Sequence, residues 1–256
     1  MKAQFTFGKT TWEADLSTGV DISIPVRGGN RGLRCWGVDF PRIEPHRAGS
    51  FTGSIQAGAS VNFRDITFNP HAHGTHTECL GHITESEESV LEHPPAPWVL
   101  AALASLTPEE RAGDRLITQA QLQSVLQEPL PEAVVLRTLP NPESKKFKQY
   151  SDTNPPYLEA RAASWLRTKG VLHLLLDLPS VDREEDGGKL SAHKAFWGLP
   201  EDPRPRATIT ELIYVPEDVA DGTYLLNIQM AAFENDASPS RPILFPISVL
   251  TGQEGG

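Results

Sequence analysis

The sequence predicts an α/β protein in which one β-rich domain combines a mixed sheet with flanking helices. The chain has 256 residues and is 39% hydrophobic, which fits one globular domain over residues 1–256 and excludes disorder as a description of the whole. Apolar and polar residues alternate in the first third, as in strands that are buried on one face. In the middle third, helical and strand-like segments take turns, which is typical of βαβ units around a covered sheet.

Alternating residues define the strands expected in the first third. Residues 20–24, 61–63 and 66–68 place apolar side chains at every second position, so we expect each segment to bury one face. Residues 27–50 lie between them, are rich in glycine and proline, and predict a loop.

Helices and buried strands are expected in the rest of the chain. Thr118 can cap a first helix that Pro129 ends. Its apolar stripe consists of Leu122, Val125 and Leu126. A second helix runs from about residue 156 to residue 169, and Gly170 follows where a C-terminal cap belongs. Apolar runs of strand length occupy residues 133–138, 171–178, 223–229 and 243–249.

The charge and the cysteines exclude several classes of protein. The 23 basic and 33 acidic residues give a net charge of −10, which argues against nucleic-acid binding. The longest apolar stretches are about half of a membrane span, and the N-terminus has no apolar signal segment. Two cysteines, Cys35 and Cys79, do not build a disulfide framework and fit a reducing compartment. We therefore expect a cytoplasmic protein that binds neither nucleic acid nor membrane.

A cluster of histidines is the most informative feature of the sequence. Four of the eight histidines fall within twelve positions, and a glutamate lies among them: His71, His73, His76, Glu78 and His82. Imidazole and carboxylate are the ligands that bind Zn²⁺, Mn²⁺ or Fe²⁺ in proteins. The spacing favours a metal site over a polar loop with exposed histidines.

The parity of these positions suggests how they share a site. On an extended chain His76, Glu78 and His82 point to the same side, because side chains alternate with period two. A one-residue bulge at Gly74 would bring His71 onto that face, and glycine permits such a bulge.

A second candidate group, His193 and Glu211, lies far downstream. Glu211 is flanked by Ile209 and Leu212, and a buried carboxylate is costly unless a metal or a base holds it. Taken singly, each residue has a simpler interpretation: His193 would be an ordinary helix residue, and Glu211 would lie on an exposed edge.

Together these residues resemble the cyclase-type family of metal-dependent hydrolases, which includes bacterial kynurenine formamidase and isatin hydrolase. The family signature is His-x-Gly-Thr-His-x-Asp-x-Pro-x-His, and residues 74–82 match most of it. Further segments follow in the family's order: Asp15-Leu-Ser17, Asp177-Leu-Pro-Ser-Val-Asp182, His193, Ile209-Thr-Glu211-Leu and Ser238-Pro-Ser-Arg241-Pro. The chain departs at Ala72, where the signature has His, at Glu78, where it has Asp, and at Leu80, where it has Pro.

The resemblance implies a fold of the swivelling β/β/α type, assembly as homodimers or homotetramers, and one or two divalent ions per chain, Zn²⁺ or Mn²⁺. The metal-ligand positions of the family fall on His76, Glu78, His193 and Glu211. His82 occupies the position of the general acid and base. Either His71 or His73 replaces the missing histidine, and we favour His71 because a bulge disturbs its neighbours least.

The expected activity is hydrolysis of an amide C–N bond by metal-activated water, in an aryl formamide such as N-formylkynurenine or in a cyclic amide. Trp36 and Phe40 can form an aromatic wall over this small substrate, and Arg42 can hold a carboxylate, as can Arg34 or Arg47. A lactone or ester hydrolase or a lyase of the same family is the alternative, as is a non-catalytic protein that binds a metal or ligand.

Overall fold

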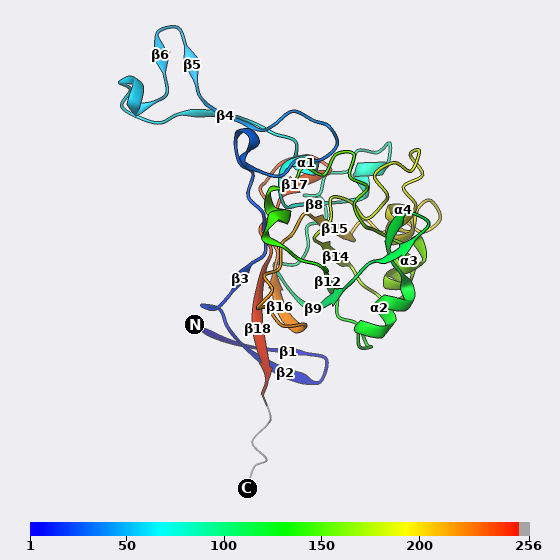
Figure 1. Cartoon of the computed structure of the whole chain (residues 1–256). Coiled ribbons are helices and arrows are strands. Elements are labelled where there is room, and N and C mark those ends of the chain that lie inside the picture. The colour runs from blue at the N-terminus through cyan, green and yellow to red at the C-terminus, as the bar shows by residue number, and fades with distance from the viewer. Residues whose placement is uncertain (251–256) are drawn as a thin grey trace.

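An eleven-stranded mixed β-sheet runs through the structure, a computed structural model that describes residues 1–250 (Figure 1). Its strand order is β1-β2-β18-β16-β9-β12-β14-β15-β8-β17, and β3 pairs with β18 beside this path. The strands are β1 (Lys2–Phe7), β2 (Thr10–Asp15), β3 (Val20–Asp21), β8 (His76–Glu78), β9 (Trp98–Leu106), β12 (Ala133–Thr138), β14 (His173–Leu176), β15 (Thr208–Glu211), β16 (Gly222–Asn227), β17 (Ala237–Pro239) and β18 (Ile243–Val249). Residues 251–256 of the predicted domain lie outside the described residues.

The centre of the sheet is parallel and buried on both faces. Strands β9, β12, β14 and β15 pair in parallel, and all six residues of β12 are buried. Val134 and Leu136 pack into the cluster formed with the helices, whereas Val135 joins a second cluster on the opposite face. Continuous apolar runs suit such strands, because neither face meets water.

Three helices cover one face of the parallel strands, on the right in Figure 1: α2 (Gln119–Val125), α3 (Ala160–Thr168) and α4 (Ser191–Trp197). The predicted cap of α2 is confirmed, since the Thr118 hydroxyl accepts a hydrogen bond from the Gln121 N–H at 3.3 Å. Leu122 and Leu126 are buried, but Val125 is 39% exposed, so the predicted stripe is wrong at that position.

The second helix begins later than predicted. Tyr157 and Leu158 form β13, which pairs with β11 (Asp114–Ile117) in a small sheet completed by β10 (Glu109–Arg111). The helix α3 therefore starts at Ala160. Gly170 follows it with a φ of +83°, as expected of a C-terminal cap.

The structure confirms the bounds of some predicted strands and shifts those of others. Residues 133–138 and 243–249 are strands with the predicted bounds, while β14 and β16 are shorter than predicted. Ile22 and Ile24 are buried as the alternation around β3 predicts. The hairpin of β1 and β2 and the nine-residue β9 were not among the expected strands.

An arm formed by residues 42–67 projects from the body at the upper left of Figure 1. It contains β4 (Arg42–Pro45), β5 (Arg47–Ala48), β6 (Phe51–Thr52) and β7 (Arg64–Thr67), paired as two antiparallel ribbons. The prediction that residues 61–63 and 66–68 bury one face is wrong for these side chains, since Ile66 is 60% exposed. Among residues 1–250, no second layer covers either face of this two-stranded ribbon.

The remaining elements are one helical turn, α1 (Pro70–His73), and four 3₁₀ turns at Gly29–Arg31, Ile55–Ala57, Leu80–Ile83 and Glu143–Phe147. Among residues 1–250, no helix has the length and apolar character needed to cross a membrane. Cys35 and Cys79 are both buried and free.

Candidate metal centre

The candidate site is built on β8 and its neighbour β15, beside the carboxyl ends of the parallel strands. The two strands are antiparallel, with His76 opposite Glu211 and Glu78 opposite Ile209. Directly opposed residues share a face, and alternate residues along a strand do too. The pairing therefore places His76, Glu78 and Glu211 on one face of the sheet.

Glu78 is the fully buried centre of this group. Its Oε1 lies 3.0 Å from His193 Nε2, and its Oε2 lies 3.1 Å from His71 Nδ1. Burial opposes ionisation of Glu78, but the surrounding imidazoles, first that of His82, outweigh burial and hold its pKa well below the usual value. Glu78 is thus an anion ringed by nitrogen atoms.

His193 enters from the first turn of α4 with a fixed orientation. Its Nδ1 donates to Asp182 Oδ2 at 2.7 Å, so its Nε2 faces Glu78. Asp182 also accepts the backbone N–H groups of Ala192 and His193 at the start of the helix. Burial lowers the pKa of His193, but Asp182 and Glu78 outweigh burial and raise it to about 10.

His76 and Glu211 complete the buried face. The ring Nδ1 of His76 donates to the carbonyl of Gly74 at 3.1 Å, which leaves its Nε2 3.6 Å from Glu211 Oε2. Glu211 Oε1 accepts the N–H of Val181 at 2.9 Å. Burial and the charge of Glu78 raise the pKa of Glu211, because two buried carboxylates so near each other resist ionising together.

The structure separates the two histidines that the sequence left as alternatives. Instead of a bulge at Gly74, residues 70–73 form the helical turn α1, capped by the Asn69 side chain. Gly74 is extended, and a β-carbon there would lie 2.8 Å from the carbonyl oxygen of Ile24. His71 points into the cluster. His73 instead accepts a hydrogen bond from the Asn69 N–H at 2.8 Å and lines a separate cavity.

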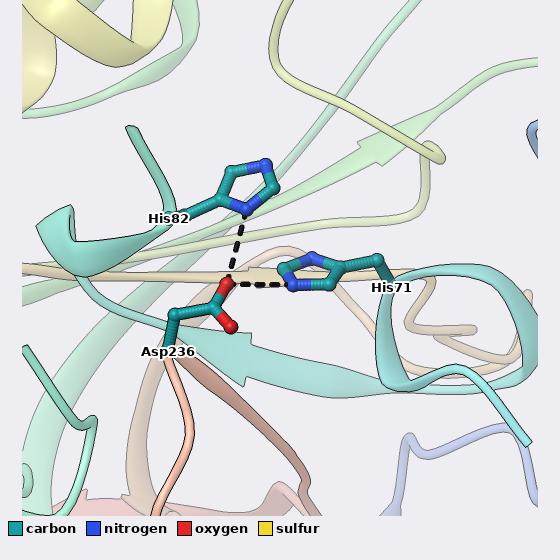
Figure 2. Close-up of side chains that lie close together, drawn as sticks. All are labelled: His71, His82 and Asp236. Atoms are coloured by element: carbon teal, nitrogen blue, oxygen red, sulfur yellow. Dashed lines mark hydrogen bonds and ion pairs between the residues drawn. The ribbon is translucent and has the colours of Figure 1, made fainter. Parts of the chain in front are cut away.

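Asp236 also belongs to the site, although no sequence pattern marks it. Its Oδ2 accepts hydrogen bonds from His71 Nε2 at 2.8 Å and from His82 Nδ1 at 3.0 Å (Figure 2). Burial opposes the charge of Asp236, but the two imidazoles outweigh burial and hold its pKa well below the usual value. His82 itself is partly exposed, and its Nε2 lies 3.9 Å from Glu78 Oε2.

The residues expected to contact substrate lie in two places. Trp36 is 39% exposed, and its indole N–H donates to the carbonyl of His71 at 3.2 Å, so it borders the cluster. Phe40 and Arg42 line the cavity of about 470 Å³ that contains His73. Arg34 stacks on the Phe40 ring at 4.3 Å, and Arg47 lies on the arm in β5.

The side chains fit a divalent metal ion. His76 Nε2 and Glu78 Oε2 are buried and make no well-aligned hydrogen bond, although His71 Nδ1 lies 3.1 Å from Glu78 Oε2. A buried polar atom without a hydrogen bond costs about 1–3 kcal/mol. Three groups offer ligand atoms within 4.8 Å of one another: His71, His76 and Glu78; Glu78, His82 and His193; and His71, His82 and Asp236. Nitrogen and carboxylate oxygen suit Zn²⁺ and Mn²⁺, and an ion would satisfy both orphaned atoms.

Known proteins resemble this chain over most of its length. Kynurenine formamidase of Bacillus cereus is 28% identical over 230 residues, which cover 89% of this chain and 97% of that protein. Two solved structures share the fold. A predicted metal-dependent hydrolase from Bacillus stearothermophilus has a TM-score of 0.60 at 19% identity and covers 89% of this chain and 98% of its own. Isatin hydrolase A from Labrenzia aggregata has a TM-score of 0.62 at 11% identity, with 89% and 93% covered.

The sequence profile of the family described as "Putative cyclase" matches residues 15–183, which is more than half of the chain. The matched region includes the signature segment of α1, β8 and His82 and ends just after Asp182. The protein therefore belongs to the cyclase family.

Proposed function

We propose that this protein is a metal-dependent hydrolase that cleaves an amide C–N bond in a small molecule, either an aryl formamide such as N-formylkynurenine or a cyclic amide. The observation that carries the proposal is the buried carboxylate Glu78, ringed by histidines, with an orphaned oxygen beside the partly exposed His82. The full-length similarity to kynurenine formamidase supports the amide substrate.

The ligand atoms of the site suit one or two ions, Zn²⁺ or Mn²⁺. His71, His76 and Glu78 would hold one, and Glu78, His193 and Glu211 would hold a second that shares the Glu78 carboxylate. When bound, such an ion lowers the pKa of a coordinated water to roughly 7 and polarises a carbonyl.

His82 would move the proton. Its Nε2 faces Glu78 while its Nδ1 is held by Asp236, and its side chain is partly exposed to solvent. A base in this position accepts the proton of the attacking water and passes it to the leaving nitrogen. Trp36, whose indole N–H donates to the carbonyl of His71, would provide an apolar surface for the substrate. Phe40 and Arg42 would act only on a substrate that extends past α1.

We further propose that the chain assembles as a homodimer or homotetramer through the arm. Five large apolar side chains on or beside its ribbons are 40% to 60% exposed: Phe51, Ile55, Val61, Phe63 and Ile66. Exposed apolar groups gathered on a projecting segment mark an interaction surface. Light scattering should show a dimer or tetramer for the wild type and a monomer for Phe63→Asp combined with Ile66→Lys. A monomeric wild type contradicts this assembly.

The two free, buried cysteines support a cytoplasmic location.

The activity is tested on purified protein by metal analysis and by a panel of formanilide, lactam and lactone substrates with added Zn²⁺ or Mn²⁺. We expect at least one bound ion per chain and hydrolysis of a formanilide or lactam. His76→Ala should abolish both, whereas His93→Ala, at an exposed histidine outside the cluster, should change neither. Less than one ion per chain, together with no effect of His76→Ala on metal content, would refute the hydrolase. Hydrolysis of lactones alone would favour the alternative enzyme.

A further inference from the structure

One carboxylate oxygen joins two histidines that have different expected roles. Asp236 Oδ2 accepts from Nε2 of His71 and from Nδ1 of His82 (Figure 2). The rings stack with centroids 4.2 Å apart and an interplanar angle of 26°. Each ring turns its other nitrogen toward Glu78 Oε2, at 3.1 Å for His71 Nδ1 and at 3.9 Å for His82 Nε2. The two imidazoles therefore present opposite nitrogens to the site.

The main chain fixes the position of Asp236 independently of these side chains. Strand β17 begins at the next residue and pairs with β8, so that Ala237 lies opposite Glu78. The carbonyl of Asp236 accepts the N–H of Cys79 at 3.0 Å, and that of Asn235 accepts the N–H of Val90 at 2.9 Å. The carboxylate thus stands on a paired backbone immediately beside Glu78.

Such a fixed acceptor selects a tautomer for each ring. A neutral imidazole carries one N–H donor and one acceptor nitrogen, and the partner of the donor decides which is which. With Nε2–H donated to Asp236, His71 offers the lone pair of Nδ1 toward Glu78. With Nδ1–H donated to the same oxygen, His82 offers the lone pair of Nε2.

We propose that Asp236 is a positioning residue with two functions: it orients His71 as a metal ligand through Nδ1, and it orients His82 as a proton acceptor through Nε2. This inference rests on the proposed hydrolase function. Carboxylates that hold ligand histidines contribute 10- to 100-fold to metal affinity or activity in other metal sites. Here a single oxygen couples metal binding to proton transfer.

Two measurements test this without relying on turnover. In the zinc-loaded wild type, long-range ¹H–¹⁵N spectra of the histidines should show His71 protonated at Nε2 and His82 at Nδ1. The opposite tautomers would overturn the proposal, and this result needs no variant. Competition with a chelator should show that Asp236→Asn weakens zinc binding about 10- to 100-fold, while Glu234→Gln, at an exposed neighbour, leaves zinc affinity unchanged.

Kinetics separate the two functions of Asp236. At saturating zinc, Asp236→Asn should still lower kcat about 10- to 100-fold with KM little changed, because His82 loses its partner. In the Asp236→Asn background, His82→Ala should then cost little more. If Asp236→Asn recovers the full wild-type kcat at saturating zinc, Asp236 does not orient His82. If its zinc affinity equals that of the wild type, Asp236 does not orient His71. If the wild type hydrolyses no amide, the proposed function fails, whereas the tautomers and zinc affinities still decide the role of Asp236.

Discussion

A buried ion pair between Lys145 and Asp177 should contribute strongly to stability. Lys145 Nζ donates to Asp177 Oδ2 at 2.7 Å, to the Thr138 carbonyl at 2.6 Å and to the Thr138 hydroxyl at 2.9 Å. The side chain of Asp177 is fully buried, and that of Lys145 is 12% exposed. Asp177 also opens the segment that ends at Asp182, the partner of His193. The pair therefore anchors part of the candidate site.

The change Lys145→Met keeps the length of the side chain and removes its charge. Asp177 is left as an uncompensated buried carboxylate, and breaking a buried pair in this way costs about 3–5 kcal/mol. For a chain of this size, that lowers Tm by roughly 10 °C. Burial raises the pKa of Asp177 even with Lys145 present, so the variant can escape part of the cost by taking up a proton. Because the folded state then favours the protonated acid, the cost should be larger at pH 8 than at pH 5.

Urea unfolding at these two pH values measures the effect, and Asp177→Asn completes a double-mutant cycle. Removing the charge of Asp177 should recover about 1–3 kcal/mol of the loss caused by Lys145→Met. Lys146→Met serves as the control, since Lys146 pairs with the exposed Glu143 and such a pair contributes about 0–1 kcal/mol. A cost below about 1 kcal/mol at pH 8, or strictly additive single costs in the cycle, would refute the reasoning.

Three further predictions concern other parts of the molecule. Burial, followed by Arg204 and Arg206, lowers the pKa of His173 from 6.5 to about 4, so the unfolded chain binds a proton more readily between these values. The free energy of unfolding should therefore fall by up to roughly 3 kcal/mol as the pH drops from about 6.5 to about 4, and His173→Gln should reduce that slope in urea titrations. Thr118→Ala removes the cap of α2 and should cost about 1 kcal/mol, measured by the urea midpoint. Zinc at 100 times its Kd should stabilise the wild type by about 2.7 kcal/mol, and Glu78→Asp should shrink the resulting rise in Tm.

The sequence predicted those elements whose pattern does not depend on a distant partner. Residues 133–138 and 243–249 were assigned correctly as strands, and Thr118 marked its helix through local capping chemistry. The strand β17 has three residues and no pattern of its own, because pairing with β8 defines it. The arm was misjudged for the opposite reason, since its alternation is real but nothing within the described chain covers the apolar face.

The site was predictable where its residues are close in sequence. His76 and Glu78 share one face of β8, as the parity of an extended chain predicts. The extended geometry is wrong for His82, which lies on the 3₁₀ turn Leu80–Ile83 and reaches Glu78 from there. Asp236 was beyond reach, because it lies 165 residues from His71 and no local pattern marks it. The choice between His71 and His73 depends on the helical turn α1. Residues 71–76 are treated as extended in the sequence prediction, which therefore does not reveal this turn.

Two of the three departures from the family signature, at positions 72 and 78, would compensate each other in space if His71 replaces the missing histidine, as we propose. The signature places a histidine four residues before His76 and a shorter aspartate at position 78. Here the histidine comes one residue earlier, on α1, and the carboxylate is one methylene longer. As a result, Glu78 Oε2 still reaches His71 Nδ1 at 3.1 Å while Oε1 reaches His193 Nε2 at 3.0 Å. Shortening Glu78 alone would withdraw its oxygens by about 1.5 Å from a ring that Asp236 holds in place. Glu78→Asp, which restores the signature residue, should therefore weaken metal binding, because the positions of His71 and Asp236 suit the longer carboxylate.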